Sequence, residues 1–290
     1  MNSIRCNWPS PSIIGAAVIA LLVTATAALG EVPSQAEPAL RPCRDAKLSL
    51  AGPIERYIDA VSTNWLLRAC RDNPAMLDMF AARDQRPYRN LLPWSGEFAG
   101  KYLTGTTQVL RTADNERLRA ATAEFVKNFV ALQDADGYLG PFPRDYRLTG
   151  KAPNTGSEAA PGDTWDLWNH YHAIVGLLLW HEDSQDAHAL AAARRIGDLL
   201  CAKFLDAGVA VSSTGSFEMN QAVVHGLALL YRRTGEQKYL ELAQRVVEDF
   251  AAPGAGDYLR QGLAGVEFYQ LPKPRWESLH PLMGLAELYF

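Results

Sequence analysis

Apolar residues recur at intervals of three and four along the chain from about Pro53 onward, and long runs of strict apolar–polar alternation are missing. This spacing puts the apolar side chains on one face of an α-helix rather than on one face of a strand. Clusters of glycine and proline separate the helical stretches, as at residues 136–137, 141–143 and 253–254. The pattern predicts an all-α protein.

The helical pattern repeats as a unit of helix, tight turn and second helix. One copy covers residues 176–200, a second follows fifty positions later at 226–250, and a looser one runs from Gly105 through Phe129. In the second helices of the two closer copies, the apolar faces are predicted to carry Leu190, Ala193, Ile196 and Leu200, and Leu240, Ala243, Val247 and Phe250. One hairpin cannot bury its own apolar stripe, so the copies must stack, either as an open solenoid or as a closed ring of the (α/α)6-barrel, or toroid, type.

Residues 284–290 repeat the start of a hairpin and stop where its turn is expected. A first helix without its partner leaves an apolar stripe uncovered. We therefore expect a partial barrel, in which residues 53–290 form part of a larger toroid. The alternative is that Phe290 is a natural terminus whose helix docks on an earlier hairpin.

The first thirty residues have the pattern of a cleavable signal peptide. Arg5 is the only charged residue before Glu31, residues 13–28 are apolar or small, and Ala28 and Gly30 are small residues at the two positions that a signal peptidase reads. The alternative, a transmembrane anchor, would need a longer apolar run. We expect residues 1–30 to be removed, residues 31–52 to be a linker or leader, and the mature protein to be periplasmic or secreted.

Charge and cysteine content exclude several classes of function. The net charge is −4, and lysine and arginine are spread along the chain, so neither nucleic acid nor an anionic membrane is an expected partner. After signal cleavage Cys43, Cys70 and Cys201 remain, which permits one disulfide. The chain has no C-x-x-C and no H-E-x-x-H motif, so we predict no metal site within this segment.

Carboxylates, histidines and tryptophans gather at the starts of successive predicted helices, within residues 94–97, 163–172, 218–221 and 275–280. In a closed toroid these helix starts line one mouth of a central cavity. Aromatic rings and polar groups together suit sugars, because the rings stack on the sugar face and the polar groups bind its hydroxyls. The candidate carbohydrate-binding residues are His172, His280, Glu97, Trp165, Asp166, Glu277 and Asn220.

Each candidate has a purely structural interpretation. Trp165 suits a core anchor, His172 shares a stripe with apolar residues, and Glu277 suits the first turn of a helix. Asp163 and Thr164 are residue types that cap helices. Glycoside hydrolysis needs two carboxyl groups facing each other. The available carboxylates are Glu97, Asp166, Glu218 and Glu277. The sequence does not show which of them face each other, so the catalytic residues stay unassigned.

The order and spacing of several motifs resemble the N-terminal half of glycoside hydrolase family 127, the bacterial β-L-arabinofuranosidase-like family. The matching stretches are residues 64–67, 94–105, 132–139, 165–178, 226–239 and 276–289. The resemblance implies an (α/α)6 barrel followed by β-sandwich domains. It also implies hydrolysis of β-linked L-arabinofuranose or related sugars, with retention of configuration.

The resemblance further implies a cysteine nucleophile held by zinc and a glutamate acid/base, in a later part of the family's barrel than this sequence reaches. Zinc is thus implied only for a full-length protein, and we expect this segment alone to be inactive. His172 matches a substrate-contacting histidine of the family and His280 is a looser match. Lys101 stands where many members have histidine, and His225 where many have a carboxylate.

Two other readings of the sequence stay open. One is a different α/α-toroid sugar enzyme, an epimerase or a polysaccharide lyase, which would use paired histidines or a tyrosine–histidine base. The other is a non-catalytic helical-repeat binding module. The sequence leaves the sugar, the linkage and the oligomeric state open.

Overall fold

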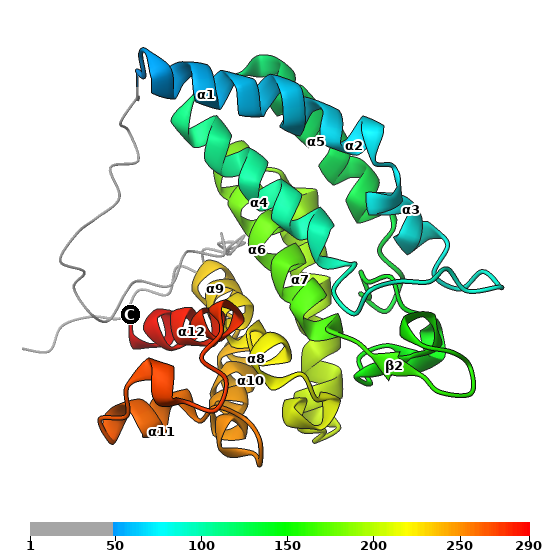
Figure 1. Cartoon of the computed structure of the whole chain (residues 1–290), viewed down its shortest axis with the longest axis vertical. Coiled ribbons are helices and arrows are strands. Elements are labelled where there is room, and N and C mark those ends of the chain that lie inside the picture. The colour runs from blue at the N-terminus through cyan, green and yellow to red at the C-terminus, as the bar shows by residue number, and fades with distance from the viewer. Residues whose placement is uncertain (1–48) are drawn as a thin grey trace, which may run out of the picture.

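The computed structural model describes residues 49–290, and helices form nearly all of its regular structure (Figure 1). The predicted all-α class is confirmed. The α-helices are α1 (Pro53–Val61), α2 (Leu67–Asp72), α3 (Ala75–Ala81), α4 (Glu97–Thr112), α5 (Glu116–Ala131), α6 (Asp166–Ser184), α7 (Ala187–Leu200), α8 (Phe217–Asn220), α9 (Val223–Thr234), α10 (Gln237–Glu248), α11 (Tyr258–Leu263) and α12 (Leu279–Tyr289).

Short helical turns of other types connect or extend the α-helices. Two are π-helical, η1 (Ser62–Leu66) and η4 (Cys201–Asp206). The others are 3₁₀ turns, namely η2 (Arg144–Tyr146), η3 (Pro153–Thr155), η5 (Val211–Thr214), η6 (Asp249–Ala251), η7 (Phe268–Gln270) and η8 (Trp276–Ser278).

A two-stranded antiparallel ladder joins β1 (Lys151–Ala152) to β2 (Gly162–Asp163), with Lys151 opposite Asp163. The sequence analysis predicted no strands, because strands of two residues are too short for an alternating pattern to show. The ladder also changes the interpretation of Asp163, which pairs with Lys151 instead of capping the next helix. The residue before α6 is Trp165, whose side chain makes no capping hydrogen bond.

The repeated hairpins predicted from the sequence are present as α4–α5, α6–α7 and α9–α10. Asn115 and Asp186 cap the second helices of the first two hairpins by accepting hydrogen bonds from the backbone N–H groups of Leu118 and His188. In the third, Gly235 ends α9 in the left-handed conformation at φ 70°, which glycine adopts without steric cost. Local chemistry therefore fixes each turn.

The first helices of the hairpins form one row, with α4 next to α6, α6 next to α9, and α9 next to α12 (Figure 1). Helices α5, α7 and α10 pack behind this row, and the stripes between the two layers form the core. In α10 the core face carries Leu242, Ala243, Val246 and Tyr239, while Leu240 and Val247 are only half-buried. Of the predicted face, Ala243 and Phe250 are buried, so the prediction was correct at these two positions and missed Tyr239, Leu242 and Val246.

Both ends of the row expose apolar side chains. Ile54, Tyr57 and Trp65 are exposed beside α1, and Met283 and Tyr289 are exposed on α12. On α12 the exposed apolar side chains also include Leu279.

Several predictions concern residues outside the described part of the chain, namely the signal peptide, nearly all of the leader and Cys43. Within residues 49–290, Cys70 and Cys201 are both free thiols. No helix in this range combines the length and the apolar character needed to cross a bilayer.

Candidate functional site

The candidate site is built around one face of α6. Trp168 and His172 are four positions apart, so they lie above one another on the helix, and Tyr171 lies beside them. The Trp168 ring is fully buried, and its centroid lies 4.4 Å from that of His172 and 4.7 Å from that of His280, both in edge-to-face geometry. Trp168 therefore joins α6 to α12 and holds two of the predicted sugar-binding histidines side by side.

Glu97 lies on the opposite side of Trp168, at the start of α4. It is buried and accepts a hydrogen bond from the indole N–H of Trp168, while its Oε1 lies 2.8 Å from Lys101 Nζ. The Lys101 ammonium also lies 5.3 Å from the ring centroid of Trp168 and 4.9 Å from that of Trp276, within cation–π range. Both oxygens of Glu97 are thus engaged by other residues of the protein.

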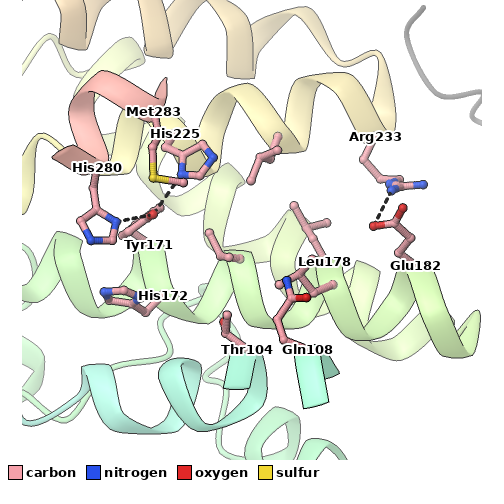
Figure 2. A pocket seen from close by; sticks show the side chains of 13 residues that line it. Thr104, Gln108, Tyr171, His172, Leu178, Glu182, His225, Arg233, His280 and Met283 are labelled. Carbon is pink, nitrogen blue, oxygen red and sulfur yellow. Dashed lines mark hydrogen bonds and ion pairs between the residues drawn. The ribbon is translucent and has the colours of Figure 1, made fainter. Parts of the chain in front are cut away.

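Tyr171 connects three helices of the row. Its hydroxyl lies 2.9 Å from Nδ1 of His225 on α9 and 2.8 Å from Nδ1 of His280 on α12 (Figure 2). His172 differs from these two histidines, because its Nε2 is buried and has no hydrogen-bond partner among the described residues. A buried imidazole nitrogen without a partner is costly unless a ligand satisfies it.

Burial keeps the histidines neutral at physiological pH. It lowers the pKa of His225 to about 4. It also lowers the pKa of His280 to about 4, with further contributions from the neighbouring His225 and Lys101 and against the opposing effect of Glu277. Burial lowers the pKa of His172 well below its ordinary value, and Lys101 adds to this effect. Burial also raises the pKa of Tyr171, which therefore keeps its proton. Neutral imidazoles can both donate and accept hydrogen bonds.

A pocket of about 380 Å³ opens beside these side chains, a size that suits a small ligand (Figure 2). One end of this pocket is formed by Tyr171, His172, His225 and His280, and we therefore call the whole pocket the histidine pocket. The rest of the pocket lining is mostly apolar and ends at the charged pair Glu182 and Arg233. The residues of this part of the lining are Thr104, Gln108, Val175, Leu178, Leu179, Glu182, Leu229, Arg233 and Met283.

The predicted site residues fall into two groups. His172, His280 and Glu97 lie together around Trp168, as described above. Trp165 lies outside this group, half-buried against Trp94 with ring centroids 4.9 Å apart. The structure therefore brings together only some of the seven candidates, and the others make contacts within the scaffold.

Asp166 is buried at the first turn of α6, where its carboxylate serves the scaffold. It accepts hydrogen bonds from the Tyr138 hydroxyl at 3.1 and 3.2 Å and from the Leu148 backbone N–H at 2.8 Å, and it lies 3.3 Å from Nδ1 of His170. These contacts connect α6 to the segment between α5 and α6.

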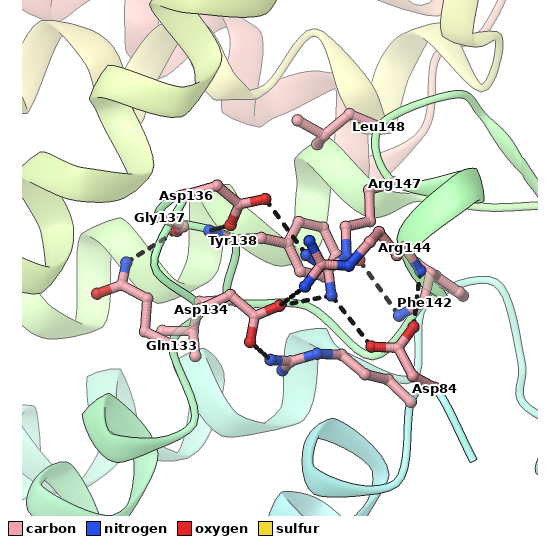
Figure 3. Close-up of polar contacts among 12 residues, drawn as sticks. Asp84, Gln133, Asp134, Asp136, Gly137, Tyr138, Phe142, Arg144, Arg147 and Leu148 are labelled. Atoms are coloured by element: carbon pink, nitrogen blue, oxygen red, sulfur yellow. Dashed lines mark hydrogen bonds and ion pairs between the residues drawn. The ribbon is translucent and has the colours of Figure 1, made fainter.

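That segment is held by an ion-pair network around Arg147 (Figure 3). The Arg147 side chain is 7% exposed and lies 2.6 Å from Asp134, and 3.3 Å from both Asp84 and Asp136. Its guanidinium also stacks over the Tyr138 ring, 4.3 Å from the centroid. The network thus fixes the ring that holds Asp166.

Asn220 and Glu277 are also mostly committed to neighbours. Asn220 is buried and donates to Thr214 Oγ1 at 3.1 Å and to the Gly215 carbonyl at 3.0 Å. Glu277 is buried and pairs through Oε1 with Arg275 at 2.9 Å, while its Oε2 has no partner among the described residues. Arg275 in turn contacts Glu218 at 3.1 Å, so this positive charge is shared between two carboxylates.

Sequence reasoning left Lys101, Trp168, Tyr171, His225 and Trp276 out of the predicted site. The stripe of Trp168, Tyr171 and His172 on one helix was visible as a signal. The partners of Tyr171 were not, because they lie 54 and 109 positions further along the chain.

The described residues do not assemble a zinc site. No group of three histidine, cysteine or acidic side chains in residues 49–290 has the geometry to hold a metal ion. Cys201 is buried, its Sγ lies 3.6 Å from the Lys238 carbonyl, and burial raises its pKa to about 12, so it stays a thiol. Burial likewise raises the pKa of Cys70. Neither thiol has the character of a metal-bound nucleophile.

Known structures share this fold. A GH127 β-L-arabinofuranosidase from Geobacillus stearothermophilus superposes with a TM-score of 0.52 at 16% identity, covering 80% of this chain and 36% of its own. A second GH127 β-arabinofuranosidase gives a TM-score of 0.51 at 17% identity, covering 67% of this chain and 31% of its own. The toroid-like fold is thereby confirmed, and this chain spans about a third of the length of those proteins.

No curated protein sequence matches the chain significantly. The family model described as "Beta-L-arabinofuranosidase, GH127 catalytic domain" matches residues 54–270. This range includes α4, α6 and α9, which carry three sides of the histidine pocket. The chain belongs to the GH127 β-L-arabinofuranosidase catalytic-domain family.

Proposed function

We propose that this chain forms the sugar-binding wall of a glycoside hydrolase that acts on β-linked L-arabinofuranose or related sugars in plant- or microbe-derived glycans. Family membership supports the class of enzyme. The observation that carries the binding role is the buried, unpartnered Nε2 of His172 beside the pocket. A sugar hydroxyl bound there would satisfy this nitrogen.

The surroundings of His172 support a sugar as the ligand. Trp276 supplies exposed aromatic surface at this end of the site, because it is 54% exposed and its ring centroid lies 5.6 Å from those of both Trp168 and His280. Sugars present apolar C–H faces to aromatic rings and hydroxyls to polar side chains. The neutral imidazoles of His225 and His280 add polar atoms without adding charge, which suits an uncharged sugar.

The described residues are better suited to binding than to cleavage. Glu97 is engaged by Trp168 and Lys101, and Glu277 by Arg275, so each carboxylate has a cation beside it. Cleavage of a glycosidic bond requires two carboxyl groups, or an equivalent nucleophile and acid, across the bond. We therefore propose that this segment alone binds sugar and does not hydrolyse it.

Zinc enters this proposal only through the family resemblance. Since Cys70 and Cys201 do not fit a zinc-bound thiolate, no step of the proposed function depends on a metal held by residues 49–290. Export is a further part of the proposal and is supported by the signal-type sequence of residues 1–30.

The decisive experiment expresses residues 31–290 and measures L-arabinose binding and hydrolysis of aryl arabinofuranosides. We expect binding without turnover. His172→Ala should weaken binding about 3- to 10-fold, since one neutral hydrogen bond contributes about 0.5–1.5 kcal/mol. The matched control is His188→Ala, an exposed residue at the start of α7 that should leave binding unchanged. Equal affinity of both variants would remove His172 from the site, and robust turnover would contradict the binding-only role.

One observation favours a second candidate function. The Tyr171 hydroxyl between two imidazoles resembles the tyrosine–histidine groups that transfer protons in metal-free sugar epimerases and polysaccharide lyases. Activity on such substrates in metal-free buffer, lost in both His172→Ala and His280→Ala, would support this alternative. If the full-length protein binds sugar but acts on none of these substrates, this result would support a non-catalytic binding module.

A further inference from the structure

We infer that the hydroxyl of Tyr171 holds His225 and His280 in opposite tautomers, so that the histidine pocket presents one imidazole acceptor and one imidazole donor. The inference about tautomers depends only on the geometry around Tyr171. Its consequence for sugar recognition rests on the proposed function.

The two short contacts of the hydroxyl restrict its hydrogen bonding. Both are made to the same ring atom, Nδ1, at 2.9 Å for His225 and 2.8 Å for His280 (Figure 2). A tyrosine hydroxyl has one proton to donate. The two Nδ1 atoms therefore cannot both be acceptors, and at least one of them must carry a proton and donate to the hydroxyl oxygen.

The opposite extreme, in which both Nδ1 atoms donate, is also unfavourable. The hydroxyl proton of Tyr171 would then need a third partner, and no other hydrogen bond of this hydroxyl exists among residues 49–290. Tyr171 is 2% exposed, so water would not readily supply an acceptor. Leaving a buried donor unsatisfied costs about 1–3 kcal/mol. One donating and one accepting Nδ1 is the arrangement without such a cost.

Both rings are neutral at pH 7, which makes the tautomer question meaningful. Their pKa values are lowered to about 4, chiefly by burial. Burial alone lowers the pKa of His225, whereas His225 and Lys101 lower the pKa of His280 further and Glu277 opposes them. A neutral imidazole carries one proton, so the state of Nδ1 determines the state of Nε2.

The two Nε2 atoms must then differ. The histidine whose Nδ1 accepts from Tyr171 has a protonated Nε2, and the histidine whose Nδ1 donates has an Nε2 lone pair. Neither Nε2 makes a hydrogen bond within the described residues, and both rings line the pocket. A donor on one ring and an acceptor on the other suit sugar hydroxyls, which both donate and accept hydrogen bonds. Tyr171 is thus a positioning residue that sets the polarity of the sugar site.

The test is nitrogen NMR of the full chain labelled with ¹⁵N-histidine at pH 7. Signals of His225 and His280 are assigned from His225→Gln and His280→Gln. We expect one of the two to be protonated at Nδ1 and the other at Nε2. The same tautomer in both rings would overturn the inference, and this result requires no variant of Tyr171.

Tyr171→Phe then tests the positioning role. Phenylalanine keeps the ring but removes the hydroxyl, so both histidines are expected to shift toward a mixture of tautomers, and L-arabinose affinity is expected to fall about 3- to 10-fold. The matched control is Tyr231→Phe on α9, whose hydroxyl makes no hydrogen bond with the described residues. Unchanged tautomers in Tyr171→Phe would contradict the role of the hydroxyl. Opposite tautomers without any sugar binding would leave this inference standing while contradicting the proposed function.

Discussion

Gly100 on α4 lies directly against the backbone of His172 on α6. A Cβ atom added to Gly100 would fall 2.3 Å from the His172 carbonyl carbon, a separation that real side chains do not adopt. On α6, Gly176 faces the same crossing, and its own added Cβ would lie 2.8 Å from the Gly100 carbonyl oxygen. Two glycines therefore let α4 and α6 approach closely enough for Glu97 to reach Trp168.

Gly100→Ala is expected to force the two helices apart. Because the obstacle is backbone rather than a flexible side chain, we expect a loss of about 1–3 kcal/mol in the free energy of unfolding, as for other overpacked sites. Sugar affinity should fall as well, because the His172 backbone must move. Chemical denaturation and calorimetric titration measure the two effects.

Gly105→Ala is the matched control for this experiment. It lies on the same helix, and no atom of another element lies within 4 Å of its added Cβ. Alanine is favoured over glycine inside a helix by about 0.5–1 kcal/mol, so this variant should be slightly more stable than the wild type. Destabilisation of both variants to the same extent would show that the α4–α6 crossing is not special.

The ion-pair network predicts that replacing Arg147 destabilises the protein more than replacing the neighbouring Arg144. Lysine at position 147 keeps the charge but cannot reach Asp84, Asp134 and Asp136 together. We expect Arg147→Lys to lower the free energy of unfolding by about 1–3 kcal/mol. Arg144→Lys should change it by less than about 0.5 kcal/mol, because Arg144 is 71% exposed and 3.8 Å from Asp134. A large loss in the Arg144 variant would contradict this account.

The buried histidines are expected to make the stability of the protein depend on pH. The pKa of His225 is lowered from 6.5 to about 4, so between these values the unfolded chain binds a proton that the folded chain does not. The contribution of the neutral His225 ring to the free energy of unfolding is therefore complete above about pH 6.5. This contribution, up to about 3 kcal/mol, is lost as the pH falls toward 4.

The measurement compares the free energy of unfolding at pH 7 and pH 4.5 in wild type and variants. His225→Gln removes the titrating group, so its stability should depend less on pH than that of the wild type. His188→Gln, at an exposed position, should keep the wild-type slope. Parallel slopes in all three proteins would exclude the assigned role of His225.

The proposed export gives a prediction that is independent of the sugar site. When residues 1–290 are expressed in a bacterium, the cleaved chain should begin at Glu31, after the small residues Ala28 and Gly30. Intact mass measurement and N-terminal sequencing of the protein from the periplasm or medium test this. An uncleaved chain in the membrane fraction would instead favour an anchor.

The hairpins could be predicted from the sequence because helical periodicity and turn chemistry are local properties. Asn115, Asp186 and Gly235 each end or begin a helix through contacts with residues a few positions away. The buried face of α10 was harder to predict, since Leu240 and Leu242 are equally apolar and only the position of neighbouring helices decides between them.

The site was less predictable because its important properties depend on distant residues. The stripe through Trp168 and His172 was evident, but not that Nε2 of His172 would lack a partner. Asp166 has the residue type of a catalytic or binding group, yet Tyr138 and Leu148 occupy its carboxylate. No local pattern distinguishes a carboxylate that is committed to the scaffold from one that is free to meet a ligand.

The far end of the histidine pocket bears on what a bound molecule would contact. Beyond the imidazoles the lining becomes aliphatic through Val175, Leu178 and Leu179, and it finishes at Glu182, which is paired with Arg111 at 3.1 Å. Thr104 and Gln108 are the polar side chains along that stretch, and Glu182 lies 3.7 Å from Arg233 at its end. A molecule that fills the cavity would therefore meet neutral imidazoles at one end, aliphatic surface in the middle and an ion pair at the other end.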